Sequence, residues 1–285
     1  MSAILDPTRP GATARARRWK PVLSVWVSAV VHVGALACAV AQPELWRWAL
    51  GAIIANHLLL AAAVFWPRGT VAGPNLVRLS PAAAARNEIS LNFDDGPDPE
   101  VTPRVLEVLD RYRARASFFC IGRKAAAFPD LVQEIVRRGH SVENHSHRHS
   151  LAFAFYGYSS LKQEVEASQR AIAEVSGRLP AFFRAPAGFR SPLLDPVMAA
   201  CGLRYVSWTR RGFDTVSGDA DIVLERLAKG FAPGDILLMH DSGSARTRAG
   251  DPVVLAVLPR LLDLAAARGL KPVTLPQACR DELGL

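Results

Sequence analysis

Two long apolar runs lie near the start of the chain. The first, Val22 to Ala41, has 20 residues and no formal charge, and the second, Ala49 to Trp66, has 18. A helix of 20 residues is about 30 Å long, which matches the hydrocarbon core of a bilayer. Only Gln42 to Trp48 separates the two runs. The pattern therefore predicts a hairpin of two membrane-spanning helices within residues 22–66.

Two alternatives compete with this interpretation. Ala39-Val40-Ala41 resembles the cleavage site of a secretory signal peptide, and a buried hairpin of a soluble protein would also be apolar. The apolar core of a signal peptide has only about 7–15 residues, whereas here a longer run is followed by a second one. We therefore expect both helices to be retained as an anchor. Within them, His32 and His57 lack carboxylate partners, which favours a role in helix packing.

The positive charge of the chain is concentrated before and just after these runs. The net charge is +8, but residues 1–86 hold 9 Lys and Arg against 2 Asp and Glu, whereas residues 87–285 hold 25 against 24. This balance excludes a general nucleic-acid-binding face on the larger part. Positive flanks on both sides of the hairpin predict a basic cytoplasmic N-terminus (1–21), with the following domain on the cytoplasmic side of the inner membrane.

From Asn87 onward, strand patterns alternate with helical patterns, and residues 67–86, rich in Ala, Pro and Gly, form the expected linker. The predicted strands are Glu88–Phe93, Ala116–Ile121, Ser141–Asn144, Ala181–Arg184, Arg204–Trp208, Asp235–Met239 and Lys271–Leu275. The predicted helices are Val101–Arg113, Ala125–Arg138, Ser159–Val175, Pro192–Ala200, Ala220–Lys229 and Pro252–Arg268. The alternation predicts one α/β domain, 87–285, with a mostly parallel sheet that is open or rolled into a barrel.

Polar residues gather where these predicted strands end, which is where α/β folds place their active sites. They are Asp94 and Asp95, His145 to His149, Arg184 to Gly188, Asp214, and His240-Asp241. The spacing of His145 and His149 allows both imidazoles to face one ion, and a single carboxylate would complete a site with open positions. A divalent metal there would lower the pKa of a bound water from 15.7 to about 7.

The remaining groups suit acid and base chemistry. One of the two adjacent carboxylates could bind the metal while the other takes a proton, and His240 could protonate a leaving group. His147, between the two histidines, is expected to point away from the ion. A metal-free glycosidase is disfavoured because adjacent aspartates rarely flank a bond at the required ~5–9.5 Å.

Four ordered motifs carry a family resemblance. They are Phe93-Asp94-Asp95-Gly96-Pro97, Asn144-His145-Ser146-x-x-His149, Arg184-x-Pro186-x-Gly188 and Leu238-Met239-His240-Asp241. Together they resemble the polysaccharide deacetylase (NodB-homology, carbohydrate esterase 4) family over about residues 87–241. The resemblance implies a distorted (β/α) barrel that hydrolyses N-acetyl groups of amino sugars with one divalent metal. Zinc is the expected metal, and cobalt, nickel, manganese or iron could take its place.

By position, the resemblance also implies roles for single residues. Asp94 matches the catalytic base, Arg184 the arginine that orients it, and His240 the catalytic acid. Asp214 lies where the family often has the aspartate that tunes this histidine. Asp95, His145 and His149 match the metal ligands. Leu238 matches the residue that lines the pocket for the acetyl methyl group.

Three departures concern the substrate wall. Ala187 stands where many members have Tyr, although its backbone N–H could still donate to an oxyanion. Arg211 stands where Asp is frequent, and Thr215 where Trp often follows the aspartate. Arg210 and Arg211 form either a solvated charge pair or a grip on phosphate. These changes leave the metal ligands and the acid–base pair intact, so we expect hydrolysis to be retained.

The resulting prediction is a membrane-anchored, metal-dependent hydrolase that removes an N-acetyl or N-formyl group from an amino sugar. A cytoplasmic domain would favour a lipid-linked saccharide as substrate, and an outward-facing domain would favour peptidoglycan or an exported polysaccharide. The alternative is a membrane-tethered carbohydrate-binding module without activity. The presence of all the expected metal ligands, the base and the acid argues against this alternative.

Overall fold

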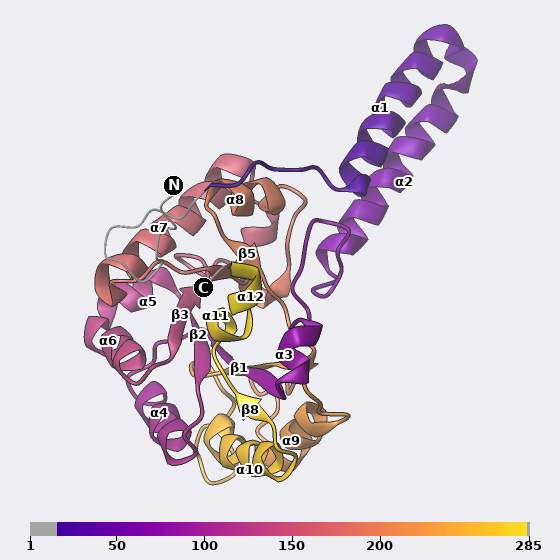
Figure 1. Cartoon of the computed structure of the whole chain (residues 1–285). Helices are drawn as coiled ribbons and strands as arrows, with labels where there is room; N and C mark the ends of the chain where they lie inside the picture. The colour runs from indigo at the N-terminus through magenta and orange to yellow at the C-terminus, as the bar shows by residue number, and fades with distance from the viewer. Residues whose placement is uncertain (1–15, 284–285) are drawn as a thin grey trace.

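A curled parallel β-sheet forms the centre of the computed structural model, which describes residues 16–283 (Figure 1). Residues 1–15, the larger part of the predicted basic N-terminus, lie outside the described residues. The strands are β1 (Glu88–Asp94), β2 (Ala116–Cys120), β3 (Ser141–Asn144), β4 (Phe182–Phe183), β5 (Arg204–Tyr205), β6 (Arg210–Arg211), β7 (Ile236–His240) and β8 (Lys271–Pro272). Seven of them follow the order β5-β4-β3-β2-β1-β7-β6, and β8 pairs with β1.

The sheet register brings the chemically active strand ends to one edge. All strand pairs are parallel, and β1, which is buried along its whole length, lies between β2 and β7. Asp94 is the register partner of Phe119 on β2 and of His240 on β7. Because parallel strands end at the same edge, the site segments that follow the first and sixth predicted strands become neighbours.

Helices cover the outside of the curled sheet (Figure 1). They are α4 (Thr102–Arg111), α5 (Gly122–Ala127), α6 (Pro129–Arg137), α7 (Tyr158–Ser176), α8 (Leu194–Ala200), α9 (Ala220–Ala228) and α10 (Val253–Ala267). Apolar residues alternate between the two faces of the strands, so that Phe118 joins the outer core and Phe119 the inner one. The short helices α3 (Pro81–Ala85), α11 (Leu275–Ala278) and α12 (Arg280–Leu283) contribute residues to the inner core.

Two predicted elements are divided in the structure. The predicted helix Ala125–Arg138 is interrupted at Phe128 (φ −126°, ψ 60°), which ends α5 before Pro129 opens α6. The ring of a proline disfavours helical geometry in the residue before it, and this explains the break. The predicted strand Arg204–Trp208 forms a strand only over β5, with an isolated bridge between Val206 and Leu76, and the further strand β6 was not predicted.

The segment between the hairpin and β1 packs on the domain. Leu79 and Ala83 are buried in the inner core, and Ser80 caps α3 by accepting from the Ala83 N–H. The buried Arg190 donates to the carbonyl oxygens of Gly69, Gly73 and Pro74 at 2.5–3.0 Å. Arg190 therefore fastens this segment to the loop after β4.

The two apolar runs form the helices α1 (Leu23–Ala41) and α2 (Trp46–Val64), joined by the short helix η1 (Pro43–Leu45). They project from the domain as a hairpin (Figure 1) and are long and apolar enough to cross a membrane. The Asn56 amide donates to Ser28 Oγ at 2.9 Å, and the rings of His32 and His57 meet edge to face at 5.2 Å. These contacts agree with the expected packing role of the two histidines.

Candidate metal centre and active site

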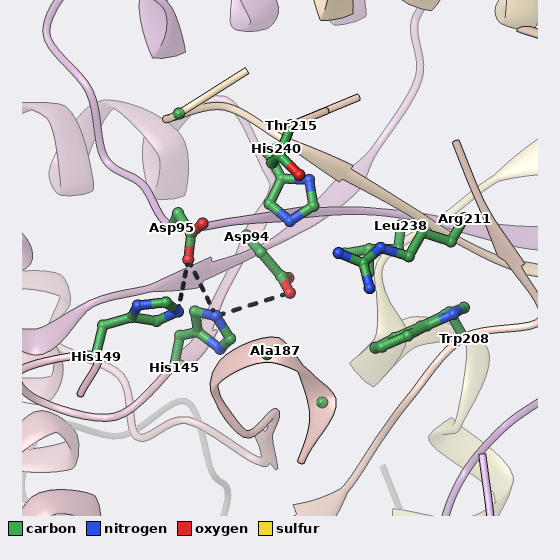
Figure 2. A pocket seen from close by; sticks show the side chains of 12 residues that line it. Asp94, Asp95, His145, His149, Ala187, Trp208, Arg211, Thr215, Leu238 and His240 are labelled. Carbon is green, nitrogen blue, oxygen red and sulfur yellow. Dashed lines mark ion pairs between the residues drawn. The ribbon is translucent and has the colours of Figure 1, made fainter. Parts of the chain in front are cut away.

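A cavity of about 270 Å³ lies at the carboxyl edge of the sheet (Figure 2). Most of the residues predicted for the site line it. The lining residues are Asp94, Asp95, His145, His149, Ala187, Gly188, Trp208, Arg211, Thr215, Leu238, His240 and Gly243. They lie at the ends of β1, β3, β4 and β7 and in the segment that runs from the end of β5 to the loop after β6, so the fold brings together residues up to 149 positions apart in the sequence.

Asp95, His145 and His149 converge on one point. Asp95 Oδ1 lies 3.2 Å from His145 Nε2 and 3.0 Å from His149 Nε2 (Figure 2). This oxygen is buried and has no hydrogen-bond partner among the described residues. A cation shared by the three groups would satisfy it. One carboxylate and two imidazoles are also a donor set that zinc and other divalent transition metals favour.

Local backbone geometry aims these three ligands. Asp95 (φ 71°) and His149 (φ 55°) both have left-handed backbone conformations, which are strained for residues with a Cβ. The Ser146 hydroxyl accepts from the His149 N–H, and the Arg184 carbonyl oxygen lies 2.8 Å from His145 Nδ1. This second contact leaves Nε2 of His145 facing Asp95, as a metal ligand requires.

The electrostatics keep Asp95 ionised. Burial raises the pKa of Asp95, but the two imidazoles beside it have the larger combined effect and hold that pKa below its usual value. A carboxylate that is charged at neutral pH can bind a cation without first losing a proton.

Asp94 is held by a fully buried arginine. Arg184 Nη1 donates to Asp94 Oδ1 at 2.6 Å, while Nη2 donates to Asn92 Oδ1 and to the Ser207 carbonyl oxygen. The guanidinium carbon also lies 4.0 Å from the centre of the Phe119 ring. With one oxygen fixed in this way, the other oxygen of Asp94 faces the cavity, 3.8 Å from His145 Nε2.

His240 is paired with a second buried carboxylate. Asp214 Oδ1 lies 2.9 Å from His240 Nδ1, and Asp214 Oδ2 accepts from the His240 backbone N–H at 2.8 Å. Burial lowers the pKa of His240, but the charge and hydrogen bond of Asp214, together with the charges of Asp94 and Asp95, outweigh burial and the net shift is upward. The ring is therefore oriented and favours its protonated form.

The remaining predicted residues form the cavity wall. Leu238 and Ala187 line the cavity, and Ala187 has a left-handed conformation (φ 55°) in the short turn η3 (Pro186–Gly188). Arg211 lies beside Trp208, with its guanidinium directed into the cavity (Figure 2). Arg210 is separate from this wall, because it is bound to Asp235 and to backbone carbonyl oxygens.

Three residues have positions that the sequence left open or missed. His147 lies outside the three-ligand cluster, as expected. Trp208, predicted only as the end of a strand, is buried and also forms part of the cavity wall. Asn92, which helps to hold Arg184, was not predicted, although a polar residue alternating with apolar neighbours in a buried strand was a usable signal.

The curled sheet and the clustered Asp, His and Arg side chains define the class of protein. A family model described as polysaccharide deacetylase matches residues 82–206, and the chain belongs to this family. A chitooligosaccharide deacetylase of Azorhizobium caulinodans is 31% identical over 198 residues, covering 67% of this chain and 94% of the relative. A peptidoglycan-N-acetylglucosamine deacetylase of Bacillus cereus is 29% identical over 197 residues, covering 67% and 88%.

Solved structures confirm the expected fold. A family 4 carbohydrate esterase from Streptomyces lividans, in complex with acetate, is 32% identical with a TM-score of 0.58, and the match covers 65% of this chain and 90% of that one. A family 4 pseudoenzyme from Bacillus anthracis is similar in fold, with 20% identity, a TM-score of 0.64 and coverage of 72% and 68%. Both the family resemblance and the α/β fold predicted from the motifs are thus confirmed.

Proposed function

We propose that this protein is a membrane-anchored, metal-dependent hydrolase that removes an N-acetyl or N-formyl group from an amino sugar. The observation that carries the proposal is the convergence of Asp95, His145 and His149 beside two further groups, Asp94 and His240, each held by a buried partner. A carbohydrate-binding module would need neither the free carboxylate oxygen of Asp94 nor a His240 imidazole paired with Asp214.

Asp95, His145 and His149 would hold the divalent metal, for which zinc is the expected choice. When bound, the metal would supply a Lewis acid that activates water and polarises the amide carbonyl. The chain provides the rest. Its three ligands leave open positions on the cavity side, where Leu238 and Ala187 shape the space for a small acyl group.

Asp94 would act as the general base. Its Oδ1 is fixed by Arg184, so the free oxygen points into the cavity with little freedom to turn away. Fixing the base in this manner removes much of the entropic cost of proton transfer. Arg184 is fully buried and is therefore a positioning residue.

His240 would act as the general acid. Asp214 binds Nδ1, so Nε2 is the nitrogen that faces the cavity (Figure 2). A proton held there can be given to the amine as the carbon–nitrogen bond breaks, which turns a poor leaving group into a neutral one. The Ala187 backbone N–H would stabilise the developing oxyanion.

The hairpin α1–α2 would anchor the enzyme in the inner membrane. Its hydropathy and length support spanning, and the contacts between α1 and α2 support retention of α1 over cleavage as a signal peptide. The Arg17 N–H donates to the Ala199 carbonyl oxygen, so the chain before α1 contacts the domain that follows α2. This contact supports both ends of the hairpin lying on one side, which we propose is cytoplasmic. A reporter fused to the C-terminus tests on which side of the membrane the domain lies. Activity of the reporter outside the cytoplasm would overturn the proposed cytoplasmic location.

Turnover distinguishes the hydrolase from the binding module. We would measure acetate and formate release by the detergent-solubilised full chain, loaded with zinc, from N-acetylated and N-formylated amino-sugar oligomers and their lipid-linked forms. Asp94→Asn keeps the three ligands and is the matched control for loss of the base. We expect release by the wild type and about 10²–10⁴-fold less by the variant. Equal background release by both proteins would favour the binding module.

A further inference from the structure

Arg211 is the arginine that lines the cavity, and its side chain has no hydrogen-bond or ion-pair partner among the described residues. Arg184 and Arg210 are each paired with a carboxylate, whereas the side chain of Arg211 forms no ion pair or hydrogen bond within residues 16–283, and its Nε is buried. The guanidinium carbon lies 5.4 Å from the Trp208 ring centre and 4.8 Å from that of Phe213. Burying a donor without an acceptor is costly, and an anion that arrives with the substrate would supply the acceptor that Nε lacks.

The anchor touches the same wall of the cavity. A Cβ placed on Gly188, which lines the cavity, would lie 2.9 Å from Cβ of Pro67, three residues after the end of α2. The Phe65 and Phe189 rings meet edge to face at 5.2 Å, and the Arg190 N–H donates to the Val64 carbonyl oxygen. The membrane end of the hairpin is therefore fixed beside the cavity and is not separated from it by a flexible tether.

Exposed apolar side chains flank the cavity on the loops nearest this wall. Phe213 and Val216, in the loop that also carries Thr215, are 46% and 79% exposed, and Trp66 at the end of the hairpin is 61% exposed. Aromatic and apolar side chains at the end of a membrane span favour the interface between headgroups and acyl chains. Continuity with the hairpin identifies the bilayer as the surface that these residues would meet.

We propose that Arg211 binds the phosphate of an amino sugar linked through that phosphate to a membrane lipid. This inference rests on the proposed function and narrows it to one substrate class. The guanidinium can form paired, charge-assisted hydrogen bonds to phosphate oxygens, and the flanking rings hold it in place. The sugar of such a lipid lies at the membrane surface, where the docked anchor holds the cavity.

The test compares three substrates with the full chain in lipid nanodiscs. These are N-acetylglucosamine attached to a polyprenyl phosphate, soluble N-acetylglucosamine phosphate, and a neutral N-acetylglucosamine oligomer. The variants are Arg211→Gln, Arg211→Lys and the matched control Arg170→Gln, which removes an exposed charge from α7. Asp95→Ala serves as the inactive reference.

We expect Arg211→Gln to lower the preference for lipid-linked over neutral substrate, as a ratio of kcat/KM values, by about ten- to a hundredfold. Arg211→Lys should restore part of this preference, and Arg170→Gln should leave it as in the wild type. An equal effect of Arg211→Gln on lipid-linked and neutral substrates would overturn the inference. Equal use of the soluble phosphate would overturn its lipid part. Absence of release from all three substrates would instead contradict the proposed function.

Discussion

Replacement of Asp214 by Asn changes the protonation of His240 while keeping the shape of the site. Both oxygens of the buried Asp214 accept hydrogen bonds, one from the His240 backbone N–H and one at Nδ1 of the ring. An asparagine has only one acceptor oxygen, and the backbone N–H, which can only donate, must take it. The NH₂ group then faces Nδ1, so the ring becomes an acceptor there and can no longer hold a second proton favourably.

The size of this effect follows from the charge that is lost. A carboxylate about 4 Å from the imidazolium charge stabilises that charge by about 4 kcal/mol at an effective dielectric constant of about 20. Without it, only the charges of Asp94 and Asp95 oppose the lowering of the His240 pKa by burial. The ring would then hold its second proton less firmly, so we expect kcat to fall by about 10²–10⁴-fold.

The assay is acetate release across pH 5–9, with metal content and thermal stability measured in parallel. The matched control is Asp241→Asn, which alters a neighbouring buried carboxyl whose hydrogen-bond partner is Thr102. We expect this control to keep most of the activity. If Asp214→Asn lost less than about tenfold in kcat and kept the wild-type pH profile, His240 would not be the acid tuned by Asp214.

Three further predictions concern positioning, packing and acid stability. Arg184→Lys keeps the charge but cannot span Asp94 and Asn92 at once, so we expect about a tenfold to hundredfold loss of kcat with metal content unchanged. Gly96→Ala would place a Cβ 2.4 Å from the buried Asp241 carboxylate, and thermal denaturation should show a loss of about 1–3 kcal/mol. Burial lowers the pKa of His140 to about 4, so the folded state binds this proton less readily than the unfolded state. Stability should fall by up to about 3 kcal/mol as pH drops from 6.5 to 4, and His140→Gln should remove that part of the loss in metal-free protein.

Controls separate these effects from general damage. Gly157→Ala adds a Cβ where no atom lies within 4 Å, so it should leave the melting temperature nearly unchanged. An equal loss in Gly96→Ala and Gly157→Ala would contradict the packing argument. For His140, an unchanged slope of stability against pH in His140→Gln would refute the assignment. Wild-type kcat in Arg184→Lys would show that a single hydrogen bond suffices to orient Asp94.

The sequence was sufficient to predict which residues meet, because the parallel sheet imposes that result. Once Asp94, His145 and His240 are assigned to strand ends, the fold places them at one edge. The hairpin helices were equally predictable, since their length and apolar character are local properties. The break at Phe128 could have been inferred from Pro129.

Other features depend on contacts that no local pattern encodes. The docking of residues 67–86 depends on hydrogen bonds from the Arg190 guanidinium to backbone carbonyl oxygens. Because every residue has such an oxygen, these partners cannot be identified from the sequence. Arg210 binds Asp235 whereas Arg211 lines the cavity, and this difference depends on which face of one short strand each residue occupies. The wall formed by Trp208 likewise depends on how far the sheet curls.

Metal content tests the central claim most directly. The full chain in detergent, stripped with chelator and reloaded with zinc, should bind about one ion per chain, and so should His240→Ala, whereas Asp95→Ala should bind none tightly. Both variants should be inactive, Asp95→Ala because it lacks the metal and His240→Ala because it lacks the acid. A wild-type protein that retains no divalent metal, or an Asp95→Ala variant that retains a full equivalent, would contradict the site described above.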